Sequence, residues 1–207
     1  CRTDHPWPML LAGNRDELRD RPALPPARHW EDRPEVVAGL DRLAGGSWLG
    51  GSDQGLAAAV MNREGSLGPA ADKRSRGELV LEALDQGTAA AAAQALQCLY
   101  PGAYRPFNLV VADPLGAYWV RHAGSGPIRA WPIEPGLHML SAGELDDGSD
   151  PRIAAFLPRF QAARVPDPET GDWLAWEALL AERDPPPGAP ASAPGSTRSS
   201  PALSSTS

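Results

Sequence analysis

The order of the apolar segments is the feature that most restricts how this chain can fold. Strand-like runs come first, two helical segments follow, strand-like runs return, and two more helical segments come after them. Runs of strands that alternate with runs of helices favour an α+β fold with antiparallel sheets over a doubly wound parallel fold. Two sheets packed together, with helices outside them, would accommodate this order.

The expected strands are short and are separated by turn-forming residues. They cover residues 9–13, 36–38, 47–50, 55–62, 107–113, 116–122, 128–133 and 137–141. Residues 51–54 have turn chemistry between two apolar runs, which predicts a β-hairpin there. Residues 19–33 are expected to form a loop, because they contain several prolines and proline supplies no amide donor to a sheet.

Helix-capping residues mark the helical segments. Ser75 and Glu78 have the spacing of a capping box, and Thr88 can cap the alanine-rich stretch that follows it. The later helices are expected over residues 153–164 and 172–183. Cys98, near the end of the alanine-rich stretch, is expected to be a buried structural thiol.

Composition excludes several classes of protein. The net charge is −7 and no run of Lys and Arg is present, which disfavours nucleic-acid partners. No apolar run is long enough to span a membrane, and no secretory signal is present. Two cysteines form neither a disulfide framework nor a cysteine-based zinc site, and the histidines lack metal-ligand spacing. We therefore expect a cytoplasmic protein with no metal or organic cofactor.

The composition changes at residue 185. Residues 185–207 are rich in Pro, Ser, Ala and Thr and contain one Leu and no aromatic residue. Such a segment buries too little apolar surface to offset the entropy of ordering it. We predict a single domain over residues 1–184 and a disordered tail over residues 185–207.

An N-terminal cysteine carries its nucleophile and its base on one residue. The α-amine of Cys1 has a reference pKa of about 7.7–8.0, so it can take the thiol proton near neutral pH. A nucleophile of this kind suits attack on amides, provided that nearby groups orient the amine and donate hydrogen bonds to the oxyanion. The alternative is that Cys1 is simply where a fragment begins.

The run Asn14-Arg15-Asp16-Glu17 follows the first strand and could supply the orienting groups. In an extended chain Asn14 and Asp16 share one face and Arg15 and Glu17 share the other. A hairpin turning near Trp7-Pro8 would place Cys1 opposite Asn14. The alternative is a solvated turn with local salt bridges. Asn62, at the end of a strand that looks buried, could either cap a turn or donate to an oxyanion.

The same residues resemble a known family. The runs His5–Glu17, Arg28–Trp30, Asp41–Gly50, Gly55–Arg63, Ser75–Leu79, Phe107–Asp113 and His138–Ser141 are similar to those of the NRDE-motif family, the transport-and-Golgi-organisation proteins and their bacterial relatives. The resemblance covers most of residues 5–180.

This resemblance implies a four-layer α/β/β/α sandwich of the N-terminal-nucleophile hydrolase type. Similar cysteine acylases cleave non-peptide amide C–N bonds. Carried over, their roles suggest Cys1 as nucleophile, Arg15 and Asp16 as the groups that serve it, and Asn62 as an oxyanion donor. The implied partner is a small acyl-amide substrate. The resemblance also implies an alternative, a non-catalytic protein that handles haem or lipid, or an incomplete chain with the fold but no activity.

Overall fold

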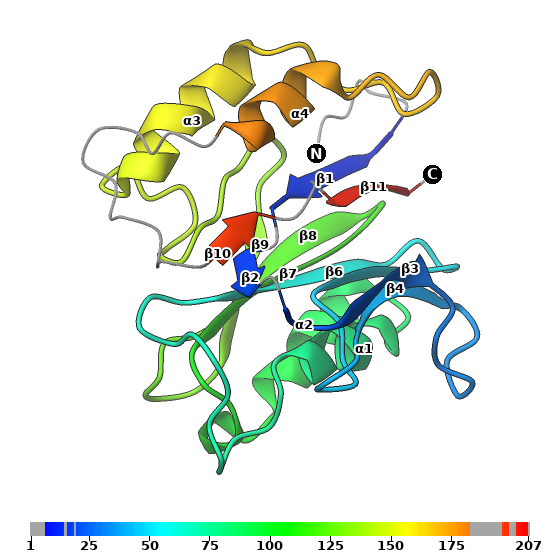
Figure 1. Cartoon of the computed structure of the whole chain (residues 1–207), viewed down its shortest axis with the longest axis vertical. Helices are drawn as coiled ribbons and strands as arrows, with labels where there is room; N and C mark the ends of the chain where they lie inside the picture. The colour runs from blue at the N-terminus through cyan, green and yellow to red at the C-terminus, as the bar shows by residue number, and fades with distance from the viewer. Residues whose placement is uncertain (1–6, 15, 19, 183–195, 199–201, 207) are drawn as a thin grey trace. The chain divides into compact units, whose positions relative to one another are not determined.

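The computed structural model describes residues 7–14, 16–18, 20–182, 196–198 and 202–206 (Figure 1). The chain divides into two compact units. One unit contains residues 1–20 and 136–205, and the other contains residues 21–135 and 206–207. The second unit is almost continuous in sequence, whereas the first is assembled from both ends of the chain.

The unit of residues 21–135 is built on a seven-stranded antiparallel sheet. Its strands, in spatial as well as sequence order, are β3 (Ala23–Ala27), β4 (Val36–Asp41), β5 (Leu49–Ser52), β6 (Ala57–Asn62), β7 (Phe107–Asp113), β8 (Gly116–His122) and β9 (Arg129–Ile133). Every strand therefore pairs with its neighbour in sequence. The predicted hairpin is confirmed as β5 and β6, in which Leu49 lies opposite Ala59.

The first strand of this sheet lies inside the segment expected to be a loop. Strand β3 pairs with β4 only, and its register shifts between Leu24 and Ala27, around the Pro25-Pro26 pair. An edge strand needs hydrogen bonds on one side only, so it tolerates prolines that a central strand excludes. The expectation of a loop was wrong because it weighed proline without considering an edge position.

Two helices cover one face of this sheet (Figure 1). They are α1 (Gly77–Leu84) and α2 (Ala89–Gln97), and a short 3₁₀ helix, η1 (Pro101–Ala103), follows them. Because side chains alternate along a strand, Phe107, Leu109 and Val111 all point to this helical face, where they are buried among α1 and α2.

The caps of these two helices differ from each other. Thr88 caps α2 as predicted, because its side chain accepts a hydrogen bond from the Ala91 amide at 3.1 Å. The capping box predicted for α1 is not formed. Glu78 pairs with Arg74, and the Ser75 hydroxyl accepts from the Gly77 amide at 3.1 Å.

A close backbone approach joins α1 to the chain before β5. The Ser47 amide donates to the Gly77 carbonyl at 3.0 Å. A Cβ atom added to Gly46 would lie 2.4 Å from the Gly77 carbonyl carbon, a distance at which one of the two backbones would have to move. Glycine at position 46 is therefore required by packing.

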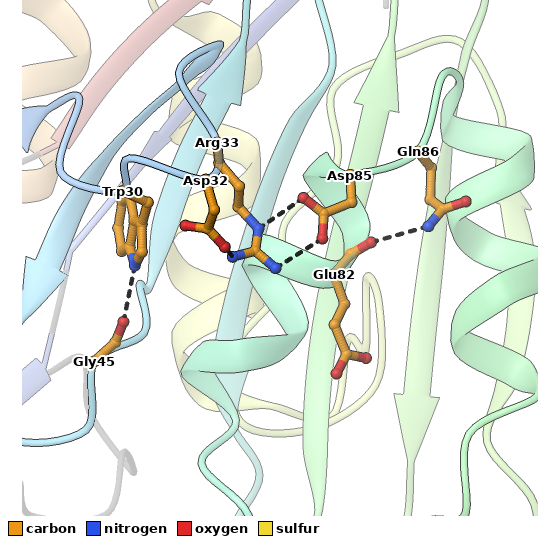
Figure 2. A network of polar contacts seen from close by, with 7 residues as sticks. All are labelled: Trp30, Asp32, Arg33, Gly45, Glu82, Asp85 and Gln86. Atoms are coloured by element: carbon orange, nitrogen blue, oxygen red, sulfur yellow. Dashed lines mark hydrogen bonds and ion pairs between the residues drawn. The ribbon is translucent and has the colours of Figure 1, made fainter.

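A polar network ties the loop before β4 to the end of α1 (Figure 2). The Arg33 guanidinium binds both carboxylate oxygens of Asp85, at 2.7 and 3.0 Å, and also pairs with Asp32. The hydrogen bond to Asp85 raises the pKa of Arg33 above its ordinary value. In the same loop, the Trp30 indole donates to the Gly45 carbonyl at 3.1 Å.

The other unit combines short strands with two helices. Its elements are β1 (Met9–Gly13), β2 (Asp16–Leu18), α3 (Pro151–Ala162), α4 (Leu174–Ala181), β10 (Ser196–Arg198) and β11 (Ala202–Thr206). Strand β1 pairs with β11, and β2 pairs antiparallel with β10. Both β10 and β11 lie within residues 185–207.

The two helices of this unit form its apolar cluster. Phe160 of α3 meets Trp176 of α4 edge to face, with ring centroids 5.5 Å apart, and Phe156 and Trp173 complete the buried set. Pro151 begins α3 in the predicted entry position, and the Asp150 carboxylate caps that helix.

The strand expected over residues 137–141 is absent from this part of the described structure. The Met139 amide donates to the Asp146 carboxylate at 2.7 Å, and the Asp146 amide donates to the Met139 carbonyl at 2.9 Å. A turn of the same chain therefore takes the backbone groups that a strand would offer to a neighbour.

Candidate functional site

The predicted site residues are distributed over both units. Cys1 and Arg15 lie outside the described residues. The Asn14 side chain donates from Nδ2 to the Leu180 carbonyl in α4 at 2.8 Å. Asp16 begins β2, where it lies opposite Arg198 of β10. Asn14 thus helps to hold the last turn of α4, whose carbonyl groups lack partners within the helix.

Asn62 ends β6 on the helical face of the seven-stranded sheet. It lies directly opposite Phe107, whose buried ring belongs to the core formed with α1 and α2. Its predecessor Met61 lies opposite Asn108, so Met61 and Asn108 belong to the other face of the sheet. That second face carries a different group of polar and aromatic side chains.

Asn108 is the central residue of this group. It is fully buried, with 0% of its surface exposed. Its Oδ1 atom accepts hydrogen bonds from Arg63 Nη1 at 2.8 Å and from Trp119 Nε1 at 3.1 Å. Arg63 directly follows β6, and Trp119 lies in β8, so the two strands that flank β7 both contribute to holding this amide.

The two donors determine how the Asn108 amide is oriented. A guanidinium and an indole N–H can only donate, so the oxygen of the amide must face both of them. The Nδ2 group consequently points away from Arg63 and Trp119 as a donor of fixed direction. A preorganised side-chain amide donor is one of the groups that stabilise the oxyanion formed when an amide is attacked.

Aromatic rings extend this face toward the edge of the sheet. Trp119 of β8 and Trp131 of β9 lie opposite each other, with ring centroids 5.1 Å apart and planes inclined by 31°. The Arg121 guanidinium carbon lies 5.5 Å from the Trp119 ring and 5.0 Å from the Trp131 ring, within cation–π range. We call Arg63, Asn108, Trp119, Arg121 and Trp131 the Asn108 cluster.

Sequence reasoning did not identify Asn108. Residues 107–113 were predicted as a strand, and the structure confirms that strand as β7. One observation could have found the site, since a single Asn between Phe107 and Leu109 interrupts an apolar strand. A buried polar side chain in such a place needs partners. Identifying Arg63 and Trp119 as those partners requires the register of the sheet.

The unit of residues 1–20 and 136–205 contains a separate polar pair. His138 Nδ1 lies 2.5 Å from an Asp146 carboxylate oxygen, and the other oxygen of that carboxylate accepts from the Met139 amide. Asp146 has φ of 55°, a left-handed conformation that non-glycine residues seldom adopt. This contact orients the imidazole. Within the described ranges, no three His, Cys, Asp or Glu side chains are grouped to hold a metal ion.

Among the helices that the structure describes, none is both long enough and apolar enough to cross a membrane.

Comparison with solved structures identifies the fold. The structure resembles the Caenorhabditis elegans ortholog of N-acylethanolamine-hydrolyzing acid amidase with a TM-score of 0.51 and 13% sequence identity. The similarity covers 83% of this chain and 80% of that one. It confirms the expected α+β fold class with antiparallel sheets, and the fold is the one that this amidase ortholog has.

Comparison with known sequences identifies the family. The chain is 37% identical over 110 residues to the transport and Golgi organization protein 2 homolog of Bos taurus, and 36% identical over the same length to that of Homo sapiens. These matches cover 51% of this chain and 38% of each relative, so they span well under half the length of those proteins. A sequence model of the family described as transport and Golgi organisation 2 matches residues 1–166. The chain therefore belongs to the transport and Golgi organisation 2 family.

Proposed function

We propose that this protein is an N-terminal-nucleophile hydrolase that cleaves a non-peptide amide C–N bond, with Cys1 as its nucleophile. The observation that carries the proposal is the fold, because the structurally similar Caenorhabditis elegans protein is named for hydrolysis of N-acylethanolamines, which are amides.

The proposed reaction has two steps. The Cys1 α-amine takes the thiol proton, and the thiolate attacks the amide carbon to form a C–S bond while an amide donor stabilises the oxyanion. The C–N bond then breaks, and the leaving amine takes the proton from the α-ammonium group. Water next attacks the thioester, which releases the carboxylic acid and restores the thiol.

The remaining proposed residues assist this centre. Arg15 and Asp16 would orient the Cys1 amine, and Asn14 contributes through its place between β1 and β2. Asn62 is the proposed oxyanion donor, so Asn62→Asp should lower kcat by about 100-fold. Asn108→Asp is the control, because it keeps an oxygen facing Arg63 and Trp119 in a fully buried position, and it should change kcat little.

The central test uses the two cysteines of the chain as a matched pair. Turnover of a panel of fluorogenic fatty-acyl amides is measured for the unmodified chain, for Cys1→Ser and for Cys98→Ser. Cys98 is free and exposed at the end of α2, so the expectation of a buried thiol was wrong and this residue is a suitable control. We expect Cys1→Ser to lose at least about 100-fold in kcat/KM and Cys98→Ser to retain it.

Two further measurements examine the proposed nucleophile. Mass spectrometry of the quenched reaction should find the acyl group on Cys1, and one residue added before Cys1 should abolish turnover by converting the amine to an amide. Turnover that survives both Cys1→Ser and this extension would refute the proposal. Separation of cell fractions would test the cytoplasmic location that we propose with it.

A second function is favoured by the aromatic part of the Asn108 cluster. The Trp119–Trp131 pair and the adjacent Arg121 offer apolar rings beside a cation, which suits a haem or lipid ligand with an acidic group. Titration with haemin or a fatty acid should then quench tryptophan fluorescence saturably, and Trp131→Leu should weaken that binding while Trp30→Leu does not. Absence of saturable quenching would exclude this function.

A further inference from the structure

A cleft of about 440 Å³ opens in the unit of residues 21–135, at the end of β8. Three parts of the chain form its walls: Lys73, residues 100–102 and 104–106 around η1, and the turn Gly124-Ser125-Gly126 that follows β8. His122, the last residue of β8, also lines it. His122 lies on the helical face of the sheet opposite Phe107, so the cleft is distinct from the Asn108 cluster.

The charge of this cleft is opposite to that of the chain. The protein has a net charge of −7, yet the described residues that line the cleft include the cations Lys73 and Arg105 and no carboxylate. The Asp72 carboxylate lies 3.5 Å from Lys73 Nζ outside this lining, and the Asp72 side chain is 78% exposed. A concave surface with two cations and no lining acid attracts anions.

Neutral oxygen atoms hold both cations in place. Lys73 Nζ donates to the Gly102 carbonyl at 2.7 Å. The Arg105 guanidinium donates to three carbonyls of the loop before Lys73, those of Gly65, Gly68 and Pro69, at 3.2 to 3.3 Å. These contacts fix the positions of the two cations without cancelling their charge. Each cation also has more N–H groups than these contacts use.

Two buried polar side chains add donors beneath the cleft. Tyr104 and His122 are 2% and 3% exposed, and neither the Tyr104 hydroxyl nor His122 Nδ1 has a hydrogen-bond partner among the described residues. Burial raises the pKa of Tyr104 to about 12, so its hydroxyl keeps the proton that it can donate. Burial, and then the charge of Lys73, lower the pKa of His122. A nearby anion would give these groups an acceptor.

We propose that this cleft binds a small phosphate-bearing anion. Lys73 and Arg105 supply charge-assisted hydrogen bonds to its oxygens, and Tyr104 and His122 supply neutral donors from below after a small movement of their side chains. Four donor groups from three parts of the chain outnumber the two oxygens of a carboxylate and suit the oxygens of a phosphate. The Tyr100 ring, 77% exposed at the rim of the cleft, is placed to cover an organic group carried by that phosphate.

The test is a titration of the full chain followed by NMR spectroscopy. The probes are inorganic phosphate, phenyl phosphate and benzoate. Phosphate should shift the imidazole signals of His122 and the amide signals of residues 100–106 and 122–126 saturably. Phenyl phosphate should shift the same signals at lower concentration, and benzoate should bind about tenfold more weakly than phenyl phosphate.

Matched variants distinguish a specific anion site in the cleft from general attraction of anions to the positive charges of the protein. Lys73→Gln and Arg105→Gln should each raise the dissociation constant for phenyl phosphate about tenfold or more. Arg42→Gln removes the same charge from an exposed turn after β4 and should leave that constant unchanged. Circular dichroism verifies that each variant is folded.

Four results would overturn the proposal. Three need no variant: the absence of saturable shifts with either phosphate probe, shifts centred outside the cleft, and benzoate binding as tight as that of phenyl phosphate. The fourth is equal weakening of phenyl phosphate binding by Arg42→Gln and Lys73→Gln. None of these outcomes depends on amide turnover, so the proposal stands or falls separately from the proposed function.

Discussion

Replacing Asn108 with Leu should show how strongly the Asn108 cluster stabilises the seven-stranded sheet. Leu has a similar size but leaves Trp119 Nε1 and Arg63 Nη1 without the oxygen that they share in this fully buried position. Leaving a buried donor without its acceptor costs about 1–3 kcal/mol, and more when the donor is charged. Burying an apolar side chain in place of the amide returns about 1 kcal/mol. We therefore expect Asn108→Leu to lower the free energy of unfolding by about 3 kcal/mol.

The assay is thermal unfolding followed by circular dichroism. For a chain of this size, about 1 kcal/mol corresponds to about 2–4 °C, so Tm should fall by about 6–12 °C. Asn108→Asp is the control, since it keeps an oxygen facing both donors and should lower Tm much less. If Asn108→Leu unfolds within about 2 °C of the unmodified chain, well below that range, the two hydrogen bonds do not stabilise the sheet as we argue.

Three other changes test separate features of the unit of residues 21–135. Gly46→Ala should lower the free energy of unfolding, measured by urea denaturation, by about 2 kcal/mol or more, because the new Cβ would meet the Gly77 backbone. Gly87→Ala is the control, since nothing lies within 4 Å of a Cβ added there. Equal effects of the two changes would contradict the packing argument. Arg33→Gln should cost about 0.5–1 kcal/mol in low salt and less in high salt, and an effect independent of salt would argue against the ion pair. The pKa of Tyr104 is about 12 in the folded state and about 10 in the unfolded state. The unfolded state therefore loses this proton at lower pH, and the free energy of unfolding should fall as pH rises from about 10 to about 12. Tyr104→Phe should remove both this fall and one phenolate step, and an unchanged profile would refute the assignment.

The sequence predicted most of the fold because local chemistry decides most of these elements. Residues 107–113 and 116–122 form β7 and β8, Thr88 caps α2, and Pro151 starts α3, as expected. An error arises where a distant partner decides the outcome. Strand β3 forms because it lies at an edge of the sheet and pairs with β4.

The candidate site was less predictable than the fold. The run from Asn14 to Glu17 was singled out by its residue types, yet the hydrogen bond of Asn14 goes to a helix carbonyl 166 positions away in sequence. Asn108 was overlooked because its partners come from two other strands, and only the register of the sheet brings Arg63 and Trp119 to one oxygen. Pairings of this kind depend on tertiary structure, which no short sequence motif encodes.

The division of the chain into a nearly continuous unit and a split one has a consequence for folding during synthesis. In the meander from β3 to β9 every strand pairs with its sequence neighbour, so the contacts of that sheet are local and fast to form. A ribosome that has released residue 135 has supplied this whole sheet together with α1 and α2. By contrast, β1 precedes this sheet in the chain and must wait for β11, which is made after the sheet, α3 and α4. Residues 9–13 are therefore paired later than the sheet, and until then they present an apolar segment that chaperones can bind.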